Sequence, residues 1–296
     1  RDSSTSRGLG DVYKRQESTY NFAMINKELE NDYPIMEEIM LKGIIDTHCH
    51  MDDPCFADRL DQVLEEQQAA GVVVIMNSGS ELPSSLRSCE MAEKYDMVYA
   101  SVGIYPNETA NLPEDYIETL RGYAERRKVV AIGEIGMDYG YEEHPDPAIQ
   151  EKCFREQLVL AEELDLPVVI HNREADEDTL RILKDYHIRG AIHRIFSPIE
   201  YAREFIKMGI YMGFGPQITY PGSDCLVQLA RECPKELILL ETDAPFLPNY
   251  GMEMPATPDM IAKVAETISE IRGDMTPQEV VDTARENAAR LYHIAC

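Results

Sequence analysis

Eight short apolar segments recur along this chain, and longer amphipathic segments separate them. Nearly continuous apolar runs are typical of parallel strands that are buried on both faces. The alternation of such strands with helices predicts an α/β fold with a parallel sheet. The expected strands span residues 43–50, 71–77, 97–104, 129–137, 166–171, 190–195, 209–214 and 237–243.

The segments between these strands carry apolar residues at three- and four-residue spacing, which predicts helices that pack one face on the sheet. Strand–helix units of about 25 residues suit a (β/α)8 TIM barrel. The rival is a doubly wound open sheet, but no glycine-rich phosphate loop follows an early strand. The expected helices span residues 58–70, 82–95, 113–127, 148–164, 176–186, 198–208, 223–233, 258–271 and 276–292.

The first forty residues differ from the rest of the chain. Residues 1–16 are polar and rich in Gly and Ser, they show no usable period, and the chain starts with Arg rather than Met. We therefore interpret residues 1–40 as a leader or non-native extension that is disordered in part. Residues 41–296 are expected to form a single TIM-barrel domain.

The charge and the cysteines limit the function further. The formal net charge of −26 argues against a broad basic surface that grips a nucleic-acid backbone. It does not exclude a phosphodiester substrate, because divalent cations would add positive charge locally. The absence of a long apolar run, of a secretory signal and of paired cysteine spacing favours a cytoplasmic protein that is not in a membrane.

Polar residues interrupt the apolar strands near their C-terminal ends, where β/α barrels carry their chemistry. In the first strand, alternation places Asp46, His48 and His50 on one side and turns Cys49 toward the core. Four further strands contribute one polar residue each to the same rim: Glu134, His171, His193 and Asp243.

Six of these seven residues, four histidines and the two carboxylates Glu134 and Asp243, are good metal ligands. Two ions about 3.5–4 Å apart could share one carboxylate as a bridge. Each residue alone is a weak signal, because a histidine in a strand is more often packed in the core. The prediction of a metal site depends on the occurrence of such residues near the ends of five strands, since burying so many unpaired polar groups would be costly. The remaining His144, His187 and His293 are interpreted as surface residues.

Four segments resemble the TatD family of metal-dependent deoxyribonucleases, a branch of the amidohydrolase superfamily. They lie in the right order and spacing, and weaker matches surround His193 and the C-terminal end, so the resemblance runs from about residue 41 to residue 292. The four segments are Ile44–Asp53, Ala131–Tyr139, Leu166–Ala175 and Leu239–Pro248.

The resemblance implies two divalent metal ions, with Zn, Mg, Mn, Fe and Co not distinguished. His48, His50 and Asp243 resemble the ligands of the first metal, and Glu134 resembles the bridging ligand. His171 and His193 resemble the ligands of the second metal. Asp243 would also act as the general base, so Asp243 and Glu134 are the expected catalytic residues.

Other positions bear on the substrate. Arg173 looks placed to meet a substrate phosphate, and a structural salt bridge is the alternative. Where the family has a histidine–proline–histidine run, this chain has Tyr105, Pro106 and Asn107. We expect Tyr105 and Asn107 to contact the substrate. The residues after His193 and those before Pro258 also depart from the family pattern.

The expected function is metal-dependent hydrolysis of phosphodiester bonds, with DNA ends as substrate. The altered substrate positions keep a second enzyme class open, namely hydrolysis of another ester, lactone, amide or small phosphoester. A third class is a non-catalytic barrel that binds a nucleotide or a partner protein. Retention of every expected ligand argues against that third class, because a decayed enzyme has no chemical reason to keep six buried polar groups.

Overall fold

The computed structural model describes residues 40–295 of the chain. Apart from Met40, the expected extension over residues 1–40 lies outside this part. All neighbouring strands pair in parallel and in sequence order, from β1 to β8. The strands are β1 (Ile44–Cys49), β2 (Val72–Ser78), β3 (Val98–Val102), β4 (Val129–Asp138), β5 (Val168–Arg173), β6 (Gly190–Ile192), β7 (Tyr211–Phe214) and β8 (Ile238–Leu240).

The chain beyond β8 returns to β1 and closes the barrel. Asp243 donates its backbone N–H to the carbonyl of His48 at 2.9 Å, and His50 donates its N–H to the carbonyl of Ala244 at 2.6 Å. These bonds join the C-terminal end of the first strand to the residues that follow the last one. The predicted TIM barrel is therefore confirmed.

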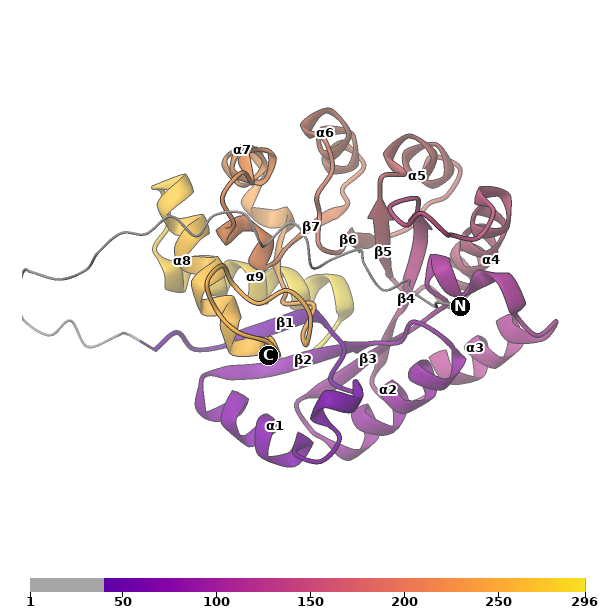
Figure 1. Ribbon diagram of the computed structural model, residues 1–296, viewed down its shortest axis with the longest axis horizontal. Coiled ribbons are helices and arrows are strands. Elements are labelled where there is room, and N and C mark those ends of the chain that lie inside the picture. Colours follow the sequence, from indigo (N-terminus) through magenta and orange to yellow (C-terminus); the bar gives the residue numbers. More distant parts are fainter. Residues whose placement is uncertain (1–39, 296) are drawn as a thin grey trace, which may run out of the picture. The chain divides into compact units, whose positions relative to one another are not determined.

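The helices lie outside the strands and follow one another around them (Figure 1). None of the described helices is long and apolar enough to cross a membrane. The helices are α1 (Leu60–Ala69), α2 (Leu82–Lys94), α3 (Tyr116–Ala124), α4 (Pro147–Leu164), α5 (Asp176–Leu183), α6 (Ile199–Lys207), α7 (Asp224–Glu232), α8 (Ile261–Arg272) and α9 (Pro277–Tyr292).

Helix α9 covers the barrel at the end away from the strands' C-termini. Its Leu291 and Tyr292 pack with Ile45, Val169 and Leu239 in one apolar cluster that takes residues from most of the strands. A second, larger cluster fills the space between the strands and the outer helices. The core thus closes one end of the barrel and leaves the other for polar side chains.

Two strands, β6 and β8, end three residues earlier than the apolar pattern predicts. β6 stops at Ile192 and β8 stops at Leu240, where residues 190–195 and 237–243 were expected to be extended. Shortly after each strand the backbone turns to positive φ, at Arg194 (45°) and at Asp243 (64°). An extended ladder cannot continue through this left-handed conformation, so both residues lie in loops at the barrel rim.

Candidate metal centre

Six polar side chains meet at the C-terminal ends of the strands. Two come from the end of β1, one from β4, one from β5, and one each from the residues after β6 and β8. Five are buried, and the side chain of His50 is 15% exposed. They are the six predicted ligands His48, His50, Glu134, His171, His193 and Asp243.

The two carboxylate oxygens of Glu134 face different pairs of histidines. Oε1 lies 2.7 Å from Nδ1 of His171 and 2.8 Å from Nε2 of His193. Oε2 lies 3.5 Å from Nε2 of His48 and 3.8 Å from Nε2 of His50. Glu134 therefore stands between two groups of ligand atoms, which is the place of a bridging carboxylate.

Asp243 completes the group around β1. Its Oδ1 lies 3.6 Å from Nε2 of His48 and 3.4 Å from Nε2 of His50. Ligand atoms also lie within 4.8 Å of one another in two triads that share His48, one with His50 and Asp243 and the other with Glu134 and His193. Imidazole nitrogens and carboxylate oxygens that converge in this way are suitable ligands for a divalent metal.

The other ring nitrogen of three histidines has a partner that orients the ring. His50 Nδ1 lies 2.9 Å from the carbonyl of Ser78, and His48 Nδ1 lies 3.1 Å from the Ser78 hydroxyl. His171 Nε2 lies 3.1 Å from Oδ2 of Asp138. These partners leave Nε2 of the first two histidines and Nδ1 of the third directed at the centre, as in metal sites.

The fourth histidine has a different environment. His193 Nδ1 is buried and has no hydrogen-bond partner among the described residues, and the nearest carboxylate oxygen, Oε1 of Glu241, is 3.9 Å away. Burial, together with the stacked ring of His48 3.9 Å away, lowers the pKa of His193 to about 3. Its Nε2 is therefore available as a neutral ligand at physiological pH.

Both carboxylates of the centre are anionic in spite of their burial. Burial opposes ionisation, but the neighbouring His193 and His171 hold the pKa of Glu134 well below its usual range. In the same way, His50 and His48 lower the pKa of Asp243 against the effect of burial. The centre thus offers ionised carboxylates to a cation.

Asp138 is a site residue that the sequence analysis missed. It ends β4, and its Oδ2 accepts a hydrogen bond from the hydroxyl of Tyr105 at 2.5 Å in addition to its contact with His171. Nδ2 of Asn107 lies 3.5 Å from the same oxygen. Tyr105 and Asn107 therefore meet at Asp138, and the Tyr105 hydroxyl also lies 3.5 Å from Nε2 of the predicted ligand His171.

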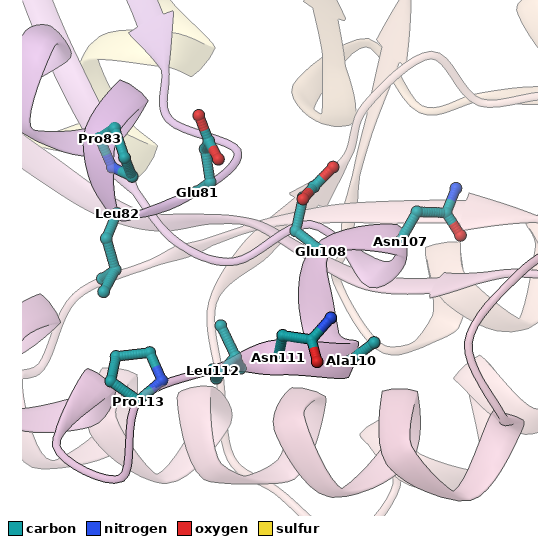
Figure 2. A pocket seen from close by; sticks show the side chains of 9 residues that line it. All are labelled: Glu81, Leu82, Pro83, Asn107, Glu108, Ala110, Asn111, Leu112 and Pro113. Atoms are coloured by element: carbon teal, nitrogen blue, oxygen red, sulfur yellow. The ribbon is translucent and has the colours of Figure 1, made fainter.

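Asn107 also lines a small pocket beside the centre, with a volume of about 220 Å³. Figure 2 shows Asn107 at one end of this pocket and Leu82 and Pro83 at the other, with the acidic side chains of Glu81 and Glu108 between them. This pocket does not include any of the six ligands.

A larger pocket of about 630 Å³ opens directly from the ligands His171 and His193. Arg173 and Arg194 also line it. The guanidinium of Arg173 lies 4.4 Å from the centre of the Tyr141 ring, and among the residues that the structure describes no carboxylate forms an ion pair with it. Within residues 40–295, the salt bridge considered for Arg173 is therefore not present.

The remaining expectations from the sequence concern residues outside the centre. Cys49 is buried in the apolar core, and its thiol donates to the carbonyl of Met76 at 3.5 Å. His187 and His293 are exposed and His144 is half-buried, so none of them reaches the ligands. The strand alternation therefore predicts correctly which way the first strand turns its side chains.

Close packing of β4 and β5 explains the glycines around Glu134. Gly136 pairs with His171 and has a φ of 146°, and a Cβ there would lie 1.9 Å from the His171 carbonyl oxygen. Only glycine permits this approach, which holds the strand of Glu134 against His171 of β5.

A family model for TatD-related DNases matches residues 45–293. The chain belongs to this family. It is a TatD-family metal-dependent hydrolase, and the match covers the positions of all six predicted ligands.

Individual relatives agree with this assignment. An uncharacterized metal-dependent hydrolase, YabD of Bacillus subtilis, is 36% identical over 255 residues, which cover 85% of this chain and 99% of YabD. A protein of Cronobacter sakazakii named 3'-5' ssDNA/RNA exonuclease TatD is 32% identical, with 78% of this chain and 91% of that protein covered. The crystal structure of YjjV, a TatD homologue of Escherichia coli, matches with a TM-score of 0.80 and 31% identity over 85% of this chain and 98% of YjjV.

Proposed function

We propose that this TatD-family enzyme hydrolyses phosphodiester bonds at DNA ends with two divalent metal ions. The proposal rests on the position of the Glu134 carboxylate, whose two oxygens face two separate pairs of histidines. The proposed ligands of the first ion are His48, His50 and Asp243, those of the second are His171 and His193, and Glu134 bridges both.

The ligand chemistry fits this group. Mixed imidazole and carboxylate ligands suit Zn, Mn, Mg, Fe and Co. When bound, a pair of such ions lowers the pKa of water and neutralises charge on phosphoryl oxygens. The protein's own contribution is the fixed geometry of the six side chains and of their partners Ser78 and Asp138.

Asp243 is the proposed general base. One carboxylate oxygen, Oδ1, faces His48 and His50, while Oδ2 accepts a hydrogen bond from Nη1 of Arg194 at 3.1 Å. The lowered pKa keeps this carboxylate ionised near neutral pH, so it can take a proton from the attacking water. Glu134 is the second proposed catalytic residue, because its two carboxylate oxygens connect the two groups of proposed ligands.

The substrate is proposed to enter through the larger pocket. Arg173 lines this pocket and has no carboxylate partner among the described residues, so its guanidinium is available to a phosphate. Tyr105 and Asn107 are proposed to contact the substrate on the side of His171 and Asp138. The relative named as an exonuclease on single-stranded DNA and RNA supports the choice of a nucleic-acid end.

A direct test is the degradation of end-labelled single-stranded DNA by the purified protein with added Mg²⁺ or Mn²⁺. The wild type should shorten the DNA only with metal, and Glu134→Ala should not. No shortening by a protein with bound metal would contradict the nuclease proposal. Small esters, lactones and phosphodiesters should be assayed in parallel, because replacement of both family histidines by Tyr105 and Asn107 favours these substrates as the second candidate.

A further inference from the structure

Two phenylalanines are exposed at the mouth of the barrel. Among the residues that the structure describes, Phe56, Phe154, Phe205 and Phe214 are buried, whereas Phe196 is 60% exposed and Phe246 is 45% exposed. Both exposed residues lie in loops that follow strands at the C-terminal end, β6 and β8. The ring of Phe246 lies 5.9 Å from that of His50. Exposed aromatic rings beside a polar centre are suitable platforms for a planar ligand.

Phe196 lines the pocket of about 630 Å³ that opens from His171 and His193. This volume falls in the range of small-molecule sites, about 300–1,000 Å³. The same pocket is lined by Arg173, Arg194 and Leu247. Glu174 and Asp176 line it as well, so the pocket combines charged side chains of both signs with apolar and aromatic ones.

Gln217 provides a second, independent sign of a ligand. It belongs to the 3-10 helix Pro216–Thr219 after β7 and lines the same pocket. Its side-chain Nε2 is buried and has no hydrogen-bond partner among the described residues. A buried donor without an acceptor is costly, and a ligand atom that accepts from it would remove this cost.

We propose that this pocket is a nucleobase subsite. The base of the nucleotide next to the scissile phosphate stacks on Phe196, an acceptor atom at its edge accepts from Nε2 of Gln217, and the phosphate lies toward Arg173 and Arg194. This inference rests on the proposed phosphodiesterase function and specifies which part of the substrate the enzyme holds. It predicts that the enzyme distinguishes a nucleotide from a base-free diester with the same leaving group.

Hydrolysis of two chromogenic diesters tests the subsite. One is the p-nitrophenyl ester of thymidine 5′-phosphate and the other is ethyl p-nitrophenyl phosphate, which lacks the base but has the same leaving group. Phe196→Ala should lower the ratio of kcat/KM for the first to that for the second about tenfold, since stacking on an aromatic residue contributes about that much per base. Gln217→Leu should lower it about fivefold, because the hydrogen-bond donor is lost.

Tyr250→Ala is the matched control. Tyr250 is an aromatic residue with 62% exposure, close to that of Phe196, but it does not line the pocket. The control should keep the wild-type ratio. A ratio in Phe196→Ala equal to that of the wild type would overturn the subsite and leave the phosphodiesterase proposal intact.

A binding measurement separates the two proposals if neither diester is cleaved. Calorimetry on the metal-loaded protein would compare thymidine 5′-phosphate with 2-deoxyribose 5-phosphate. Tighter binding of the nucleotide that Phe196→Ala reduces about tenfold would support the subsite even if hydrolysis fails. Equal binding of both ligands by the wild type would overturn the subsite whatever the outcome of the assays.

Discussion

Arg194 donates a hydrogen bond from Nη1 to Oδ2 of Asp243 over 3.1 Å, and this bond ties a pocket residue to the proposed general base. Both residues have a positive φ and lie in loops at the barrel rim. The bond holds one oxygen of Asp243 while the other faces His48 and His50.

The first prediction follows from this pair. Arg194→Ala should lower kcat about tenfold, because Asp243 loses the donor that fixes its orientation and small misplacements of catalytic groups are costly. Steady-state kinetics with the best substrate from the screen would measure it. Arg194→Lys keeps the charge but not the planar fork, so it should recover part of the rate. A kcat in Arg194→Ala equal to that of the wild type would show that the bond does not position the base.

Asp138 provides the second prediction. Asp138→Asn weakens the acceptor for Nε2 of His171, so metal affinity should fall about tenfold to a hundredfold. Competitive titration with a metal indicator would measure the affinity directly. Tyr105→Phe removes one donor to Asp138 but leaves the His171 contact, so its effect should be smaller. An unchanged affinity in Asp138→Asn would exclude a role of this carboxylate in orienting the ligand.

The third prediction concerns removal of the metal. Six buried or nearly buried polar groups converge on the centre, so a bound cation should stabilise the folded state. At a metal concentration of about a hundred times Kd the gain is about 2.7 kcal/mol, which corresponds to a rise in Tm of about 5–10 °C. Thermal melts of chelated and metal-loaded protein would show the shift. His48→Ala and Glu134→Ala should lose most of it, and a full shift in both variants would place the metal elsewhere.

The convergence of the six proposed ligands was accessible from the sequence, because a barrel brings all strand ends to one rim. Each of the six residues lies in or just after an apolar strand, and the structure brings all six together. The partners behind them were not accessible in the same way. Asp138 lies at the end of a strand like the ligands, but only the fold shows that it meets His171.

Two other features depended on tertiary geometry. The early ends of β6 and β8 follow from the left-handed backbone at Arg194 and Asp243, which apolar patterning does not encode. Burial raises the pKa of Glu241 well above its usual range, although this residue reads in the sequence as one more polar residue before Asp243. Propensity and pattern describe local structure, whereas these effects come from neighbours that are distant in the chain.

The fourth prediction is a pH dependence on the outer face of the barrel. Glu151 of α4 accepts hydrogen bonds from Arg181 of α5, at 2.7 Å and 3.0 Å, and from Arg155 at 2.8 Å. Arg181, and to a smaller degree Arg155, lower the pKa of Glu151 to about 2. Since the folded pKa is depressed, the stabilisation is present above the unfolded pKa of about 4.5 and is lost as pH falls toward 2.

Glu151→Gln should therefore reduce the free energy of unfolding by about 0.5–1 kcal/mol near neutral pH and by progressively less below about pH 4. Urea unfolding at several pH values would compare the variant with the wild type. Glu143→Gln is a suitable control, because Glu143 is exposed and its substitution changes the net charge by the same amount. A difference that does not vary with pH would show that ionisation of Glu151 is not its cause.

The last prediction tests the contact that holds β4 against β5. Gly136→Ala places a Cβ 1.9 Å from the carbonyl oxygen of His171 and requires a φ of 146° that alanine avoids. The variant should lose about 3 kcal/mol or more of unfolding free energy, and the strand that carries Glu134 should shift with it. Gly122→Ala is the matched control, because Gly122 lies within α3 and a Cβ there would have no neighbour within 4 Å. Alanine favours the helix over glycine by about 1 kcal/mol, so the control should be at least as stable as the wild type. Equal stability of both variants in chemical unfolding would contradict the close approach of the two strands.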